Sequence, residues 1–171
     1  MKFRKASALR TSLHNFLVRA VFLAPELRKA GPLVSKQDVI SIVDDNPSIR
    51  RAMKRLIESA DLIVEEFASA EEFLLSGRSQ NSACLILDLR LSGMSGLDLQ
   101  SQLQVSNPRL PIIFMSANAD EISKARARQL AAVEFLEKPI DEQALFAAIE
   151  SSLILSRSRG IRPEGFQGAI D

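Results

Sequence analysis

A run of apolar residues that ends abruptly on a carboxylate most constrains the fold of this chain. Residues 83–87 are Ala-Cys-Leu-Ile-Leu, and Asp88 follows them at once, with Gly93 and Gly96 shortly after. A short, uninterrupted apolar run bounded by turn residues is typical of a strand buried on both faces of a parallel sheet. Open α/β folds bind ligands at the carboxyl edge of such a sheet, so we expect Asp88 to lie in a functional site.

The same alternation of strand and helix patterns recurs along the chain. Helix 120–131 has the weakest apolar face, for which we expect Ile122, Ala125 and Leu130 to point inward. The whole pattern predicts one doubly wound α/β domain with a five-stranded parallel sheet and five helices. The other predicted strands are 39–43, 62–67, 110–115 and 133–136, and the other predicted helices are 47–60, 69–76, 96–105 and 141–153.

Charge divides the chain into three parts. Residues 1–36 carry a net charge of +7, residues 37–155 carry −7, and residues 156–171 carry +1. We expect the domain at 37–155, preceded by a basic extension and followed by a flexible tail. An acidic body is a poor surface for nucleic acid. The extension has three interpretations: a basic amphipathic helix for a membrane surface or a partner, an organelle-targeting peptide, or a weakly ordered segment.

Polar side chains follow four of the predicted strands: Asp44 and Asp45, Asp88, Ser116, and Lys138. All carboxyl ends of a parallel sheet lie at one edge, so three carboxylates converge if the first and third strands are neighbours. Their mutual repulsion raises at least one pKa, and a divalent cation with oxygen ligands, Mg²⁺, relieves it. With Lys138 nearby, the set predicts a receptor for a phosphoryl group on a nucleophilic Asp88.

Three stretches of the chain, in their order and spacing, resemble the receiver domain of two-component response regulators: residues 43–45, 87–97 and 135–139. Residues 67–74 are similar to the FixJ-like branch. The resemblance implies a flavodoxin-like sheet with strand order 2-1-3-4-5. That branch normally continues into a helix-turn-helix domain, for which residues 156–171 are too few. We therefore expect a stand-alone receiver without direct DNA binding.

The resemblance also implies how the phosphoryl group is received. Asp88 is expected to accept it from a histidine kinase or a histidine phosphotransfer protein. Asp45 and Asp88 are expected to bind Mg²⁺ through their side chains, and Asp44 directly or through water. Arg90 is expected to contribute its backbone carbonyl.

Three further residues are assigned to the switch by the same resemblance. Ser116 and Lys138 are expected to contact the phosphoryl oxygens, and Phe135 is the expected aromatic switch. The Lys138–Pro139 bond is cis in the family. The expected signalling face combines the fourth helix, fifth strand and fifth helix, through which the chain would meet a target or form a phosphorylation-dependent homodimer.

Two other functions are compatible with the residues. One is a magnesium-dependent phosphohydrolase with Asp88 as nucleophile, although the short connections leave little room for a substrate-binding cap. The other is an interaction module that acts through residues 1–36. We favour a cytoplasmic signalling domain over an enzyme, with catalysis limited to its own phosphorylation and dephosphorylation.

Overall fold

A five-stranded sheet forms the centre of the computed structural model, which describes residues 38–117, 120–130 and 132–158. Neighbouring strands are parallel throughout, in the order β2-β1-β3-β4-β5. This arrangement confirms the predicted fold class and strand order. The strands are β1 (Val39–Val43), β2 (Ile63–Phe67), β3 (Cys84–Asp88), β4 (Ile112–Ser116) and β5 (Glu134–Glu137).

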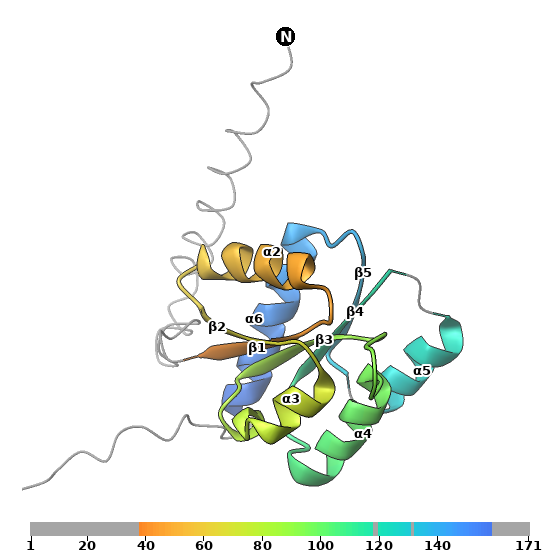
Figure 1. Ribbon diagram of the computed structural model, residues 1–171. Coiled ribbons are helices and arrows are strands. Elements are labelled where there is room, and N and C mark those ends of the chain that lie inside the picture. Colours follow the sequence, from red (N-terminus) through yellow and green to blue (C-terminus); the bar gives the residue numbers. More distant parts are fainter. Residues whose placement is uncertain (1–37, 118–119, 131, 159–171) are drawn as a thin grey trace, which may run out of the picture. The chain divides into compact units, whose positions relative to one another are not determined.

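Helices cover both faces of the sheet: α2 and α6 lie on one side, and α3, α4 and α5 lie on the other (Figure 1). A short 3-10 turn, η2 (Arg78–Gln80), occupies the predicted loop after α3. The last helix reaches Ser158, so the first three residues of the expected tail are helical. The helices are α2 (Pro47–Glu58), α3 (Ala70–Leu75), α4 (Gly96–Ser106), α5 (Glu121–Gln129) and α6 (Glu142–Ser158).

The central strand β3 shows why its sequence is apolar without alternation. Cys84 and Ile86 pack on the face of the sheet that α2 and α6 cover, whereas Leu85 and Leu87 pack on the face that α3, α4 and α5 cover. All four side chains have an exposed fraction of 0%. Because successive strand residues point to opposite faces, a strand covered on both sides needs an apolar residue at every position.

Helix α5 packs differently from the prediction. Ala127 is its buried residue, whereas Ile122 is 82% exposed, Ala125 is exposed and Leu130 is half-buried. The expected inward orientation of Ile122 and Ala125 was therefore wrong. Residues five positions apart lie about 140° apart around a helix, so burying Ala127 turns Ile122 toward solvent.

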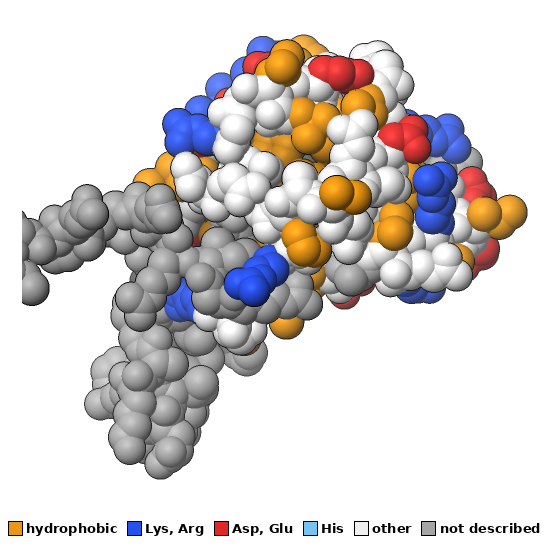
Figure 2. Space-filling view, turned by 90° about the horizontal axis from the view of Figure 1, so that it is seen from below, with side chains coloured by type: hydrophobic (Ala, Val, Ile, Leu, Met, Phe, Trp, Pro, Cys, Tyr) orange, Lys and Arg blue, Asp and Glu red, His pale blue; other side chains and the backbone are white. Residues whose placement is uncertain are grey.

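Exposed hydrophobic side chains are few among the described residues and come from different elements. Seen from below, hydrophobic side chains are dispersed among polar atoms (Figure 2). No helix in the described ranges is long and apolar enough to cross a membrane. The large hydrophobic side chains that are exposed are Ile63, Leu75, Val105, Ile122 and Ile154.

Two predicted segments fall on residues that the structure does not describe. The basic extension at residues 1–36 lies wholly outside the described ranges, as do residues 159–171 of the tail. The three interpretations of the extension and the flexibility of those tail residues stay predictions.

The Cys84 thiol is expected to be unreactive in the folded protein. Burial raises its pKa to about 12, which leaves almost no thiolate at neutral pH. Ellman's reagent should therefore modify Cys84 only after the chain is unfolded in guanidinium. Modification of the native protein as fast as of the unfolded chain would contradict the burial of this strand.

Candidate functional site

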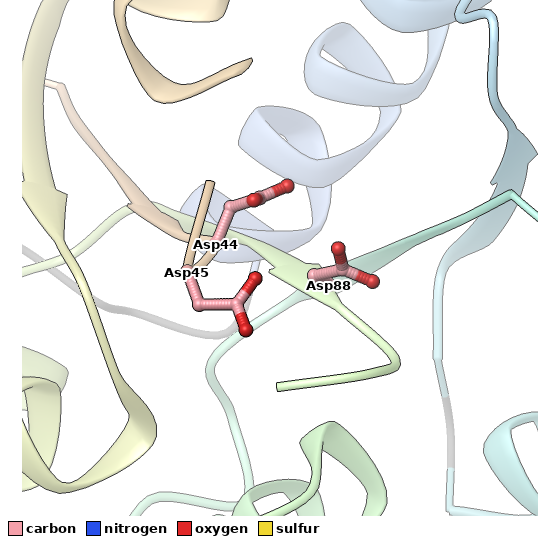
Figure 3. Close-up of side chains that lie close together, drawn as sticks. All are labelled: Asp44, Asp45 and Asp88. Atoms are coloured by element: carbon pink, nitrogen blue, oxygen red, sulfur yellow. The ribbon is translucent and has the colours of Figure 1, made fainter. Parts of the chain in front are cut away.

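Three aspartates meet at the carboxyl edge of the sheet. Asp44 and Asp45 follow the last residue of β1, and Asp88 is the last residue of β3. The two strands pair directly, with Val43 beside Leu87. One oxygen from each carboxylate lies within 4.8 Å of the others, and the three side chains lie side by side in Figure 3. The predicted convergence is confirmed.

The first aspartate of the pair is held firmly from the α2 side. The Asp44 side chain is fully buried, and its Oδ1 accepts a hydrogen bond from the Asn46 backbone N–H at 2.8 Å. Asn46 in turn caps α2 by accepting the N–H of Ser48. The Arg50 guanidinium donates to the Asp44 backbone carbonyl at 2.6 Å. Helix α2 therefore fixes both the backbone and the carboxylate of Asp44, while Asp45 stays exposed.

Lys138 lies between two of the aspartates. Its Nζ donates to Asp44 Oδ2 at 2.7 Å and to Asp88 Oδ2 at 2.6 Å. Its backbone N–H donates to the Ser116 carbonyl at 2.8 Å, which joins the ends of β4 and β5. The peptide bond between Lys138 and Pro139 is cis, as the resemblance implied.

Burial and neighbouring groups shift the pKa values of Asp88 and Lys138. Burial raises the pKa of Asp88 and outweighs the hydrogen bonds from Lys138 and the Arg90 N–H, while the charge of Asp44 adds to the increase. Burial alone lowers the pKa of Lys138, but its hydrogen bonds to Asp44 and Asp88 raise the pKa overall. The Lys138 ammonium is thus retained and offsets part of the carboxylate repulsion.

The donor set fits a hard divalent cation. Three carboxylates offer oxygen ligands only, one of them is exposed, and Lys138 neutralises only part of their charge. Mg²⁺ prefers oxygen ligands, and it binds through a few carboxylates while it keeps several waters. Among the described residues, no sulfur or imidazole ligand joins this cluster.

The other predicted site residues lie on neighbouring elements. Ser116 ends β4 and is 1% exposed. Phe135 on β5 is half-buried and stacks on Phe114, with ring centroids 5.9 Å apart and an interplanar angle of 19°. Arg90 is exposed, and its N–H donates to Asp88 Oδ1 at 3.0 Å. The metal-binding role of its carbonyl stays a prediction.

Two sets of contacts, one of them beside the site, were not predicted from the sequence. Glu71, in the first turn of α3, accepts the Met94 N–H at 2.8 Å and so contacts the loop that follows Asp88. Gln100 and Gln104 of α4 donate to carbonyls at the C-terminal end of α5. The i, i+4 spacing of these two glutamines, one of them beside buried leucines, is a signal that could have drawn attention to them.

Comparisons with known proteins agree with this geometry. The sequence model of the family described as the response regulator receiver domain matches residues 40–150 of this chain. The chain is 38% identical over 125 residues to nodulation protein W of Bradyrhizobium diazoefficiens, covering 73% of this chain and 55% of that protein. It is 34% identical over 121 residues to the transcriptional regulatory protein FixJ of Azorhizobium caulinodans, covering 71% and 57%.

A solved structure of the response regulator StyR is also similar, with 40% identity and a TM-score of 0.66. The match covers 72% of this chain and 62% of that chain. The chain spans little more than half the length of the two curated relatives above. The expected function as a stand-alone receiver therefore stays a prediction. The matched region, the strand order and the aspartate cluster together show that the chain belongs to the response regulator receiver family of two-component signalling.

Proposed function

We propose that Asp88 receives a phosphoryl group from a phosphohistidine, with Mg²⁺ bound by the aspartate cluster. The observation that carries this proposal is the position of Lys138, whose Nζ contacts both Asp44 and Asp88 at the carboxyl edge of the sheet. The Asp88 side chain is 11% exposed, so its carboxylate is held by neighbours yet open to solvent on one side.

The chemical step is an in-line displacement at phosphorus. A carboxylate oxygen of Asp88 forms the new O–P bond, and the P–N bond to the donor imidazole breaks with its electron pair returning to nitrogen. After protonation the donor leaves as neutral imidazole. Bound Mg²⁺ would supply positive charge to the phosphoryl oxygens, with Asp44, Asp45, Asp88 and the Arg90 carbonyl as its expected ligands.

The residues of the chain position and sense the product. The Lys138 ammonium, already beside Asp88, is placed to exchange its contact with the carboxylate for one with a phosphoryl oxygen. The Ser116 hydroxyl would bind a second oxygen. Because Ser116 and Lys138 are joined through their backbones, movement at either would reach β5 and Phe135. We place the output on the α5–β5–α6 face, for binding a downstream protein or a second copy of the chain.

The donor in this proposal is a histidine kinase or a histidine phosphotransfer protein. Receivers are a signalling family, and the FixJ relative is named as a transcriptional regulatory protein. No contact among the described residues favours a phosphate-ester hydrolase. An interaction module acting through residues 1–36 depends on residues outside the described ranges and stays a prediction.

Mg²⁺ is expected to raise the melting temperature of the protein, because an ion that binds only the folded chain stabilises it. At a free concentration of 100 times the dissociation constant, the gain is about 2.7 kcal/mol. Thermal unfolding followed by circular dichroism, with Mg²⁺ and then with excess chelator, measures it. Beryllium fluoride added with Mg²⁺ should raise the melting temperature further.

Two variants make this test specific. Asp45→Asn removes an exposed carboxylate of the cluster and should abolish most of the Mg²⁺ effect. Asp61→Asn is the control, because Asp61 is exposed, lies outside the cluster and has a positive φ of 60° that asparagine adopts well. An equal Mg²⁺ effect in both variants, or no effect on the native chain, would overturn the proposed site.

A further inference from the structure

The loop between β3 and α4 is held mainly by carboxylates. The N–H of Arg90 donates to Asp88 Oδ1, and the N–H of Ser92 donates to Asp45 Oδ2 at 3.1 Å. The third such contact differs in origin: the Met94 N–H donates to Glu71 Oε1 at 2.8 Å. Glu71 comes from α3 and does not belong to the aspartate cluster.

The backbone of the loop passes very close to Glu71. Gly93 has a φ of 89°, a conformation that L side chains rarely adopt. A Cβ added at Gly93 would also lie only 2.9 Å from Glu71 Oε1. The positive φ therefore favours glycine at this position, and the carboxylate of Glu71 lies directly against the loop.

Helix α3 fixes the position of the Glu71 backbone. Ala70 and Phe73, on either side of Glu71 in the helix, have exposed fractions of 0%, and the Ser69 side chain caps the helix by accepting the Glu72 N–H. Glu71 lies in the first helical turn, where the unpaired N–H groups favour a negative charge. The hydrogen bond from Met94 lowers the pKa of Glu71, so its carboxylate is ionised at neutral pH.

We infer that Glu71 is a positioning residue for the phosphorylation site: through the Met94 N–H it holds the loop that carries Arg90 in the conformation that binds the metal ion. This inference rests on the proposed function. The loop connects to Asp88 on one side, and Asp45 binds its middle through Ser92. With Glu71 in place, the loop is organised before the ion arrives, which saves the cost of ordering it on binding.

The test is the Mg²⁺ dissociation constant, measured by isothermal titration calorimetry on the full chain. Glu71→Ala should weaken binding by about tenfold, the lower end of the effect of supporting hydrogen bonds around metal ligands. Glu71→Gln keeps an acceptor oxygen at the same reach and should bind nearly as the native chain does. Glu71→Asp keeps the charge but withdraws the acceptor by one methylene, so it should weaken binding as Glu71→Ala does.

Glu72→Ala is the matched control. Glu72 is the next residue of the same helix, and its carboxylate also accepts a backbone N–H, from Ala68 at 2.6 Å, away from the loop. We expect Glu72→Ala and Glu71→Ala to lower stability to a similar extent, but only Glu71→Ala to weaken Mg²⁺ binding. Equal Mg²⁺ affinity in these two variants would overturn the positioning role alone, whereas a native chain that binds no Mg²⁺ would overturn the proposed function as well.

Discussion

Replacing Lys138 with methionine is expected to lower the free energy of unfolding by about 3 kcal/mol at neutral pH. Methionine keeps much of the volume but leaves Asp44 and Asp88 without the ammonium that bridges them. Breaking a buried ion pair on one side costs about 3–5 kcal/mol, and we take the lower end because the side chains of Lys138 and Asp88 partly reach solvent. Urea unfolding monitored by circular dichroism measures this loss.

The pH dependence of this loss has a definite sign. Burial already raises the pKa of Asp88, and removal of Lys138 raises it further. A carboxyl whose folded pKa lies above its unfolded pKa stabilises the fold when protonated, and that contribution is lost as the pH rises through the folded pKa. Lys138→Met should therefore be less destabilising in mildly acidic buffer than at neutral pH.

A lysine whose carboxylate partners are exposed supplies the comparison for this experiment. Lys124 also contacts two carboxylates, those of Glu121 and Glu137, but both partners are exposed. Surface ion pairs contribute about 0–1 kcal/mol, so Lys124→Met should cost far less than Lys138→Met. Adding Asp88→Asn to Lys138→Met should restore part of the stability. Equal losses for the two lysine variants would contradict the picture of Lys138 as the counter-ion of buried carboxylates.

Replacing Gln100 with alanine is expected to cost about 2–3 kcal/mol of stability. Its side chain is 0% exposed, and its amide donates to the carbonyls of Ala127 and Leu130 at 3.1 and 3.0 Å. Removing it leaves a cavity and takes a donor from both carbonyls. We expect the loss to stay moderate because the buried Oε1 atom of Gln100 has no hydrogen-bond partner among the described residues.

The effect should appear first in α5, which buries only Ala127 among its described residues. Hydrogen exchange of α5 amides is the sensitive measurement. Gln102→Ala is the control, because Gln102 lies on α4 with Gln100 but is exposed. Gln100→Met keeps the volume and separates the hydrogen bonds from the cavity. Unchanged exchange in α5 for Gln100→Ala would show that this amide does not hold the helix.

The sheet and the aspartate cluster were predictable because they follow from local rules. A continuous apolar run such as Leu85–Leu87 belongs to a strand covered on both sides, and parallel strands bring their carboxyl ends to one edge. Asp44 and Asp88 therefore had to meet once their strands were neighbours. The switch residues, by contrast, required the family resemblance, since neither Ser116 nor Phe135 is distinctive by itself.

The contacts that the sequence did not reveal depend on how the layers pack. Glu71 and Met94 are 23 residues apart, and their hydrogen bond depends on where the first turn of α3 lies relative to the next loop. In α5, the apolar pattern suggested Ile122, but the helix is oriented by Ala127 and by donors from α4. Apart from the i, i+4 spacing of Gln100 and Gln104, these polar contacts between elements follow no periodicity that the sequence displays.

The decisive measurement is to incubate the full chain with acetyl phosphate and Mg²⁺ and to locate the phosphoryl group by mass spectrometry. We predict one phosphoryl group per chain, on the peptide that contains Asp88, and none when Mg²⁺ is chelated or when Asp88 is replaced in Asp88→Asn. Labelling of Asp88→Asn to the same extent as the native chain would contradict the assignment of Asp88 as the phosphoryl acceptor.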